Sequence, residues 1–336
     1  MNAFKIASFH LSVLLLLCGA TSTTAAETEE VKVAAGYGIG YLPLIVMQHD
    51  QLIEKHLKVA GLSSTKVSWT QFGAGSAMND ALLSGNLHFA SGGIPPFLML
   101  WDKTRNNIDV KGVGALCSMP NFLNTRNPAI KSIKDFTEKD RIAIAGAGSS
   151  VQTIYLQMAA AQAYGDANYN RLSTLMVNLA HPDGMAAMLS GQEVNSHFTS
   201  PPFQYQELEN PGVRKVLSSY DIMGGTGSFL MLWGTGKFRS ANPQTFAAVF
   251  SAFRDATESI NRDKRRAAEI YLKVTKSKDS IERTMAMLND PDITFDVAPQ
   301  KIMKFVEFMN KVGTVKTKAA SWKDLFFPEV HGLSGS

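Results

Sequence analysis

Two segments of the chain follow the same pattern. Residues 81–97 read ALLSGNLHFASGGIPPF, and residues 187–203 read AMLSGQEVNSHFTSPPF. Each contains Leu-Ser-Gly, then a short mixed segment that includes Ser, and then Pro-Pro-Phe, and the two align without a gap. Chance similarity is the alternative, because Leu-Ser-Gly is common. The match in order and spacing favours a chain built from two similar units.

Both segments lie within an alternation of β-rich and helical stretches. Short runs rich in Val, Ile and aromatic residues predict strands, and the apolar periodicity between them predicts helices. In the first unit we expect strands at 31–36, 67–72, 86–91 and 110–116, and helices at 44–57, 77–85 and within 92–103. In the second we expect strands at 141–146, 175–182, 193–200 and 213–221, an amphipathic helix at 151–165, and helices at 183–191 and 201–209. This alternation predicts an α/β fold.

The domain organisation follows from this pattern and from the length. A chain of 336 residues is too long for one ordinary core, so two lobes are expected. We expect mixed, mainly parallel sheets with helices on both faces, and two crossovers that form a hinge. The predicted lobes are residues 31–118 with 224–336, and residues 119–223, joined near 117–122 and 221–226.

The C-terminal part of the chain is expected to be helical to about residue 311. Phe246, Val249, Phe250 and Phe253 recur at helical spacing. They predict a face packed on the core, with an aromatic ligand surface as the alternative. The charged run RDKRR at 262–266 is typical of a solvated helix end, with contact to a membrane partner as the alternative.

The first residues differ in kind from the rest. Lys5 precedes an apolar run from Ile6 to Leu17, and Thr-Ala-Ala then leads into a polar, acidic segment. We interpret residues 1–26 as a cleavable signal peptide, which implies a periplasmic protein. Cys18 raises lipidation as the alternative, although the bulky Leu17 precedes it. Cys117 is expected to be a buried small hydrophobic residue.

Charge and motifs exclude several classes of function. A formal net charge of +4 is too mild to suggest a nucleic-acid partner, and it is compatible with a small anion. The histidines show no metal-ligand spacing, and no Gly-x-Ser-x-Gly motif is present. We therefore expect no enzyme, no catalytic residue, no metal and no cofactor. His181, at an expected helix start, is interpreted as part of a capping turn.

Candidate ligand-binding residues lie in turns that lead from strands into helices. Ligands of open α/β sheets bind beyond the carboxyl ends of the strands, where helix N-termini attract anions. GAGSA at 73–77, AGSSVQ at 147–152 and the turn at 92–94 fit this description, although Gly-Ser before a helix is also an ordinary N-cap. A phosphate loop is a poorer interpretation, because no Gly-Lys-Ser/Thr follows.

Residues beside these turns would provide selectivity. Tyr37 and Tyr41 interrupt a Gly-rich turn, whereas the other aromatic residues have core packing as a strong alternative. The cleft suits a small organic anion with an apolar body better than bare nitrate. The full candidate set is Tyr37, Tyr41, Phe72, Gly75, Ser76, Gly93, Ile94, Asn121, Phe122, Gly148, Ser149, Ser150, Gln152, Ser200, Pro201 and Gly225.

Three long segments carry a family resemblance: GYGIGYLPLIVMQHDQLIEKHL, FGAGSAMNDALLSGNLHFASGGIPP and SIKDFTEKDRIAIAGAGSSVQTIYLQ. In this order they resemble the nitrate/taurine/aliphatic-sulfonate (SsuA/THI5-like) group of periplasmic substrate-binding proteins of ABC importers. The resemblance covers about residues 31–290. The chain departs from the group at Phe136 and at Glu138, Lys139 and Asp140, where Leu and Lys-Gly-Lys are usual. It also lacks the Cys-rich stretch of the fungal thiamine-pyrimidine synthases of this fold.

The resemblance implies a type II periplasmic binding protein whose lobes close on the ligand like a Venus flytrap. It implies a sulfonate- or taurine-like ligand, delivery to permease and ATPase subunits at the inner membrane, and a monomer. Three alternatives stay open: an aromatic carboxylate, a thiamine-type pyrimidine, or a sensor module for a membrane receptor.

Overall fold

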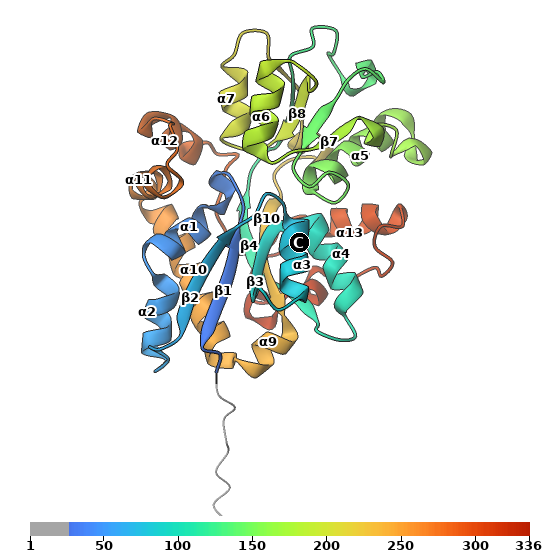
Figure 1. Ribbon diagram of the computed structural model, residues 1–336. Helices are drawn as coiled ribbons and strands as arrows, with labels where there is room; N and C mark the ends of the chain where they lie inside the picture. Colours follow the sequence, from blue (N-terminus) through green and yellow to red (C-terminus); the bar gives the residue numbers. More distant parts are fainter. Residues whose placement is uncertain (1–26) are drawn as a thin grey trace, which may run out of the picture.

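The computed structural model describes residues 27–336. The expected signal peptide at 1–26 and the lipidation alternative at Cys18 therefore lie outside the described residues. The described chain forms two lobes, each built on a five-stranded sheet (Figure 1).

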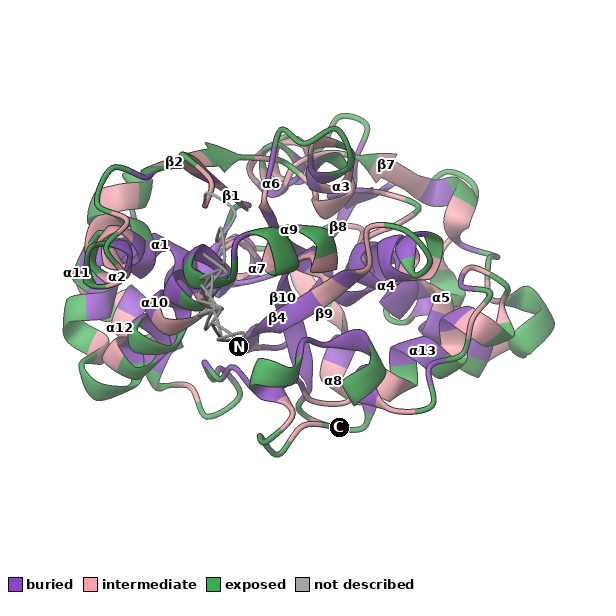
Figure 2. Ribbon diagram, turned by 90° about the horizontal axis from the view of Figure 1, so that it is seen from below, coloured by how far each residue is buried: buried purple, intermediate pink, exposed green. Residues whose placement is uncertain are grey.

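The first sheet combines strands from both ends of the chain. It contains β1 (Glu30–Ala35), β2 (Lys66–Gln71), β3 (Phe89–Gly93), β4 (Val110–Ser118) and β10 (Ser228–Thr235) in the order β2-β1-β3-β10-β4. β1 is parallel to β2 and β3, whereas β10 is antiparallel to β3 and β4. Seen from below, β10 and β4 are buried at the centre of the molecule (Figure 2).

The second sheet repeats this plan. It contains β5 (Phe122–Thr125), β6 (Ile142–Ile144), β7 (Met176–Asn178), β8 (Ser196–Thr199) and β9 (Arg214–Ser218) in the order β7-β6-β8-β5-β9. β6 is parallel to β7 and β8, and β5 inserts antiparallel between β8 and β9. In each sheet the fourth position is thus taken by the strand that has just crossed from the other lobe. The predicted α/β class with two mixed sheets is confirmed, although antiparallel pairings are as frequent as parallel ones.

Helices cover the sheets. Those of the first lobe are α1 (Leu42–His49), α2 (Leu52–Val59), α3 (Gly75–Leu83) and α4 (Ile94–Thr104). Those of the second are α5 (Val151–Tyr164), α6 (His181–Ser190), α7 (Phe203–Leu208) and α8 (Ser219–Met223). The C-terminal helices are α9 (Gly236–Ala241), α10 (Pro243–Arg262), α11 (Lys264–Thr275), α12 (Ile281–Asn289) and α13 (Ile302–Lys311). Short 3₁₀ helices occupy Ile39–Tyr41, Ile133–Asp135, Asp166–Asn168, Ser173–Leu175, Trp322–Leu325 and Pro328–Val330.

The repeated sequence pattern occupies equivalent places in the two sheets. In both lobes it covers the end of a helix (α3 or α6), the third strand in spatial order (β3 or β8) and the start of the next helix (α4 or α7). Gly85 (φ 77°) and Gly191 (φ 74°) both adopt the left-handed conformation where the helix ends. This explains the Gly at the end of Leu-Ser-Gly in both segments.

Three local predictions were wrong. The helix expected over 44–57 breaks into α1 and α2 at Gln51, which adopts a left-handed conformation (φ 51°). Gly92 and Gly93 were expected in a turn, but they pair with β10, and α4 begins directly after them. α5 is buried on nearly all sides rather than amphipathic, because it packs against α4, α8 and α13.

The predicted packing of the C-terminal apolar face on the core is confirmed. Phe246, Val249 and Phe253 are buried on α10, which packs against α1 and α2. Cys117 is buried in β4, and burial raises the pKa of its thiol. Over the described range, none of the helices combines the length and the apolar character that crossing a membrane requires.

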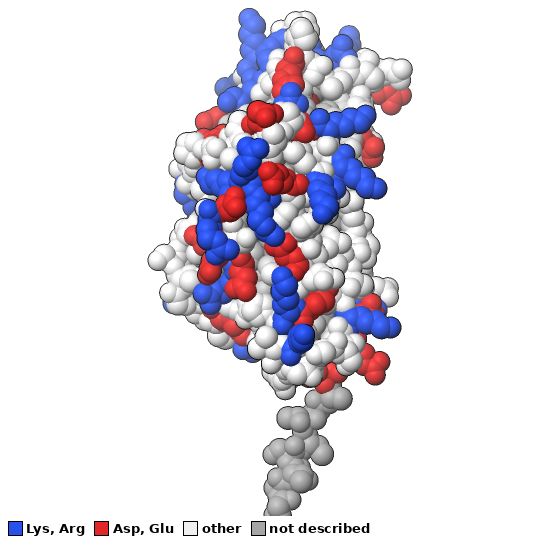
Figure 3. Space-filling view, turned by 90° about the vertical axis from the view of Figure 1, so that its left-hand side faces the viewer, with Lys and Arg blue, Asp and Glu red and all other residues white. Residues whose placement is uncertain are grey.

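The charged run at 262–266 lies on a face of mixed charge. Figure 3 shows Lys, Arg, Asp and Glu interspersed on this side of the molecule. Arg266 forms two hydrogen bonds with Asp50, at 2.7 and 2.8 Å, and Arg265 pairs with Glu269 at 3.4 Å. This pairing fits the solvated helix end better than a purely basic contact surface.

Candidate functional site

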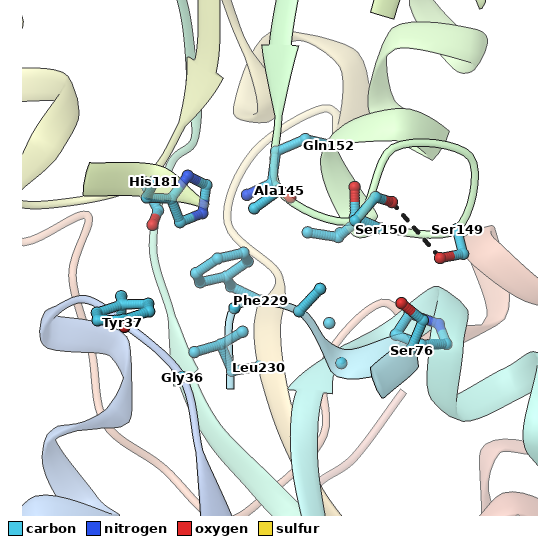
Figure 4. A pocket seen from close by; sticks show the side chains of 18 of the residues that line it. Gly36, Tyr37, Ser76, Ala145, Ser149, Ser150, Gln152, His181, Phe229 and Leu230 are labelled. Carbon is cyan, nitrogen blue, oxygen red and sulfur yellow. Dashed lines mark hydrogen bonds between the residues drawn. The ribbon is translucent and has the colours of Figure 1, made fainter. Parts of the chain in front are cut away.

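A small cavity lies between the two lobes, beyond the carboxyl ends of β1 and β6. It encloses about 40 Å³. Figure 4 shows Tyr37, Phe229, Leu230 and Ser76 of the first lobe on one side, and His181, Gln152, Ser150 and Ser149 of the second on the other. The complete lining is Gly36, Tyr37, Tyr41, Gly73, Ala74, Gly75, Ser76, Gly93, Pro96, Ala145, Gly146, Ser149, Ser150, Val151, Gln152, His181, Ser200, Phe229 and Leu230.

Four helices begin at this cavity. Residues of the first turn or the N-cap of α3, α4, α5 and α6 all belong to its lining. The first N–H groups of a helix have no intrahelical acceptor, and the N-terminus carries a partial positive charge. α4 contributes few donors, because Pro95 and Pro96 lack an N–H. The other three helices, one from the first lobe and two from the second, direct their N-terminal N–H groups toward the same cavity.

Three of these helices, α3, α4 and α6, begin without a capping side chain, and α3 and α6 are the two of them that keep N–H donors beside the cavity. The N-cap residues of α3 and α6 are Ala74 and Ala180, and neither forms a side-chain cap. The N–H groups of Gly75 and Ser76 have no hydrogen-bond acceptor within residues 27–336. A cavity at an uncapped helix start offers an anion backbone donors that would otherwise be used by Ser, Thr or Asp.

α5 is different, because Ser150 caps it. Its hydroxyl accepts the N–H of Thr153 at 3.3 Å, and the Thr153 hydroxyl accepts the N–H of Gly148 at 3.1 Å. Ser149 donates its hydroxyl to the carbonyl of Gly146 at 3.5 Å. The ordinary N-cap role therefore applies to Ser150, which nevertheless lines the cavity.

The side chains of the lining are neutral: it contains no Asp, Glu, Lys or Arg. Tyr41 is buried, which raises the pKa of its phenol, so the hydroxyl keeps its proton. The structure gives this hydroxyl no hydrogen-bond partner within the described chain. It is therefore a donor that is available to a ligand in the cavity.

Gln152 is held in place from behind the cavity. Its side-chain N–H donates to Oδ1 of Asn121 at 2.8 Å, and the N–H of Asn121 donates to the hydroxyl of Ser219 at 2.9 Å. Asn121 is fully buried on the first crossover and does not line the cavity. It supports a lining residue.

His181 lies at the end of a buried series of polar side chains that contact one another. Its Nδ1 lies 3.3 Å from Nε2 of His197 and 3.0 Å from the hydroxyl of Thr199. Nδ1 of His197 lies 2.5 Å from Oε1 of Glu207, whose other oxygen accepts the Asn124 amide at 2.8 Å. His197 and Glu207 are both fully buried.

These contacts fix the imidazole of His181 through its Nδ1 atom. Burial first, and the neighbouring His197 second, lower the pKa of His181 to about 3, so its imidazole is neutral near pH 7. Both printed contacts of His181, with the Thr199 hydroxyl and with His197, are made by Nδ1, and which atom donates in them depends on the tautomer of the rings. Nε2 has no partner among the described residues, so the neutral imidazole leaves this nitrogen to a ligand in the cavity, as a donor in the tautomer that carries the proton there.

The structure brings nine of the sixteen predicted residues to the cavity. These are Tyr37, Tyr41, Gly75, Ser76, Gly93, Ser149, Ser150, Gln152 and Ser200.

The other seven lie elsewhere. Phe72 and Ile94 pack with the core, and Phe122 contacts the ring of Tyr205 edge-on. Asn121 supports Gln152, Gly148 donates to Thr153, and Gly225 follows α8 at the second crossover. Pro201 accepts the N–H of Ile39 at 3.3 Å, a contact between the lobes.

Sequence reasoning missed ten of the lining residues. His181 was interpreted as part of a capping turn, and no local pattern reveals that His197 and Thr199, far along the chain, orient its ring. Ala74 lies within the predicted turn at 73–77 and Gly146 adjoins the predicted turn at 147–152, so including every residue in and next to each turn would have found both. Phe229 and Leu230 lie on β10, where only the sheet order brings them to the cavity. The missed set is Gly36, Gly73, Ala74, Pro96, Ala145, Gly146, Val151, His181, Phe229 and Leu230.

Within residues 27–336, no group of three or more His, Cys, Asp and Glu side chains is placed to hold an ion.

The chain is similar to known proteins both in sequence and in structure. No family model matches the chain. It is 26% identical over 259 residues to a protein of Escherichia coli (strain K12) named as an aliphatic sulfonates-binding protein, covering 76% of this chain and 75% of that protein. The alkanesulfonate-binding protein SsuA of Xanthomonas axonopodis pv. citri, solved bound to MOPS, superposes with a TM-score of 0.68 at 17% identity, covering 88% and 97% of the two chains. The periplasmic aliphatic sulphonate binding protein SsuA of Escherichia coli gives a TM-score of 0.63 at 18% identity, covering 91% and 100%. The predicted two-lobed binding-protein fold is confirmed.

Proposed function

Because the chain is a substrate-binding protein of the SsuA-like family of ABC importers, we propose that it captures an organic sulfonate between its two lobes. The lobes would enclose the sulfonate group in the cavity. The loaded protein would then deliver its ligand to permease and ATPase subunits at the inner membrane, from the periplasm. Nothing in this cycle transforms the ligand.

The convergence of helix N-termini from both lobes on one neutral cavity carries this proposal. α3 belongs to the first lobe, and α5 and α6 belong to the second. An anion between them therefore receives the full set of donors only when both lobes contact it. A sulfonate has three oxygens to receive such donors. Phe229 and Leu230 add apolar surface for the carbon next to the sulfur. The relatives named for sulfonates make this anion the first choice over a carboxylate.

The absence of an Arg or Lys in the lining determines how the ligand would be recognised. Neutral donors held in fixed directions, rather than a point charge, would select an anion by shape. The Tyr41 hydroxyl, the His181 Nε2–H and the N–H groups of Gly75 and Ser76 are the donors that we assign to the sulfonate.

Calorimetric titration of ligand-free protein with sulfonates, nitrate, benzoate and a pyrimidine tests the proposal. We expect sulfonates to bind and Tyr41→Phe to weaken them by 1.5–3 kcal/mol, about tenfold or more, because a hydrogen bond to a charged group is lost. Tyr169→Phe is the matched control, since Tyr169 lies away from the cavity against Phe308. Binding of benzoate or the pyrimidine alone would overturn the sulfonate, and equal affinity in Tyr41→Phe would overturn the assigned site.

A further inference from the structure

A second, larger cavity adjoins the first. It encloses about 590 Å³, against about 40 Å³ for the cavity between the helix N-termini. Gly36 and Tyr37 line both. We call the larger one the outer groove. Since the two spaces adjoin at these residues, we infer that a molecule held in the small cavity would extend into the outer groove past Tyr37.

The small cavity has room for an anionic group but not for an organic body. A single water needs about 10–15 Å³, so about 40 Å³ gives room for roughly three water-sized atoms. That is the size of the three oxygens of a sulfonate. The volume of the outer groove falls within the range of about 300–1,000 Å³ that is typical of small-molecule sites.

Aromatic side chains from both lobes line the outer groove. Trp69 of β2 and Tyr271 of α11 come from the first lobe, and Phe203 of α7 comes from the second. Phe203 also stacks on His181, with ring centroids 5.7 Å apart and planes 29° apart. The aromatic surface therefore begins at a residue that lines the small cavity.

The charge of the outer groove also fits an anionic ligand. Lys276 is its only charged lining residue, and it is exposed on the rim after α11. Gln48, Gln71 and Gln206 add neutral polar groups. No carboxylate lines either space, so an anion approaching through the outer groove meets no repelling side chain.

We propose that the ligand is an extended, aromatic organic sulfonate, whose sulfonate lies in the small cavity and whose ring system lies in the outer groove against Trp69 and Phe203. This rests on the proposed function and deepens it. Short aliphatic sulfonates, which leave the outer groove to water, are weaker ligands. The higher affinity of the aromatic ligand comes from apolar area removed from water and from ring stacking.

Titration with two probes, methanesulfonate and 2-naphthalenesulfonate, tests the proposal. We expect the naphthalene compound to bind at least tenfold more tightly. Trp69→Ala lowers its affinity tenfold or more and leaves that of methanesulfonate unchanged. Leu83→Ala is the control, because Leu83 is an exposed apolar residue outside both cavities.

A second measurement does not depend on how Trp69→Ala folds. Bound naphthalene quenches the fluorescence of Trp69 in the unmodified protein, and the milder Trp69→Phe removes that quenching. Equal affinities for the two probes, with no quenching, overturn the extended ligand and leave the sulfonate function standing. If neither probe binds while another class of anion does, the proposed function falls, and the extended sulfonate falls with it.

Discussion

At the scale of single residues, the site depends on polar groups that have lost their usual partners. Ala74 and Ala180 stand where a capping side chain is common, so the starts of α3 and α6 keep free donors. The Tyr41 hydroxyl and Nε2 of His181 face the same space without a partner in the described chain. Such groups cost stability while they are unsatisfied and contribute to affinity when a ligand accepts from them.

His181 leads to a prediction about pH. Its pKa falls from 6.5 to about 3 on folding, through burial first and His197 second. Between these values the unfolded chain binds more protons than the native one, so stability falls as the pH drops below about 6.5, by up to about 1.4 kcal/mol per unit. Affinity for the ligand should not follow this titration, because native His181 stays neutral from pH 5 to pH 8.

Urea unfolding at pH 7.5, 6.5, 5.5 and 4.5 measures this effect in the unmodified protein and in His181→Gln. The Gln variant should show a shallower loss of stability on acidification, since His197 and Glu207 remain but the titrating group is gone. His56→Gln, on a partly exposed residue that pairs with Asp255 at 2.7 Å, is the control. Identical slopes for His181→Gln and the unmodified protein contradict the prediction.

At the scale of elements, the starts of α4 and α5 bring the lobes into contact. A Cβ on Gly93 would lie 2.9 Å from Cβ of Val151 across the cleft. Gly93 has an ordinary backbone conformation (φ −67°), so alanine would fit its own lobe and clash only with the other. The absence of a side chain on Gly93 allows the starts of α4 and α5 to come this close to each other.

Gly93→Ala should therefore weaken ligand binding about tenfold or more, while the ligand-free protein unfolds at nearly the same temperature. Small-angle scattering of the ligand-saturated variant should show a larger radius of gyration than the unmodified protein, because the lobes stop short of contact. Gly332→Ala, where nothing lies within 4 Å of the added Cβ, is the control. Unchanged affinity and compactness in Gly93→Ala would show that binding does not need this contact.

At the scale of the whole molecule, the C-terminal helices hold the second lobe on two flanks. On one flank Arg283 of α12 bonds to Glu209 beyond α7 at 2.7 Å, and Gln206 bonds to Asp279 at 2.8 Å. On the other flank Lys304 of α13 donates to the carbonyl of Met223, at the end of α8, at 2.6 Å. These contacts join the lobes in addition to the two places where the chain passes from one sheet to the other, between β4 and β5 and between β9 and β10.

Arg283→Ala tests the first flank. Arg283 also bonds to the buried Asp279 at 2.8 Å, so only part of the total loss belongs to its partly exposed pair with Glu209, and that part should be at most about 1 kcal/mol. Because the pair spans the lobes, we expect the loss to appear as ligand dissociation up to about fivefold faster in stopped-flow experiments. The control is Arg254→Ala, whose pair with Glu258 lies within α10. Equal dissociation rates in the two variants would argue against a role in closure.

The sequence by itself determined the local order of the chain. Alternating apolar runs predicted both α/β units, and the repeated Leu-Ser-Gly and Pro-Pro-Phe predicted their equivalence, because helix ends and strand periodicity depend on near neighbours. The turns at Ser76 and Ser149 were found for the same reason. The break at Gln51 was missed, since no Gly or Pro marks it and residues distant in the chain, such as Arg266 bonded to Asp50, contact the segment.

Only the tertiary structure decided what the turns face. Glu207, His197 and His181 are joined across α7, β8 and α6, and Phe229 reaches the cavity because β10 inserts between β3 and β4. The outer groove likewise combines Trp69 with Phe203, residues of different lobes. A sequence pattern records the environment of a residue along its own element. These sites are contacts between elements, and their geometry exists only once both lobes are folded and placed against each other.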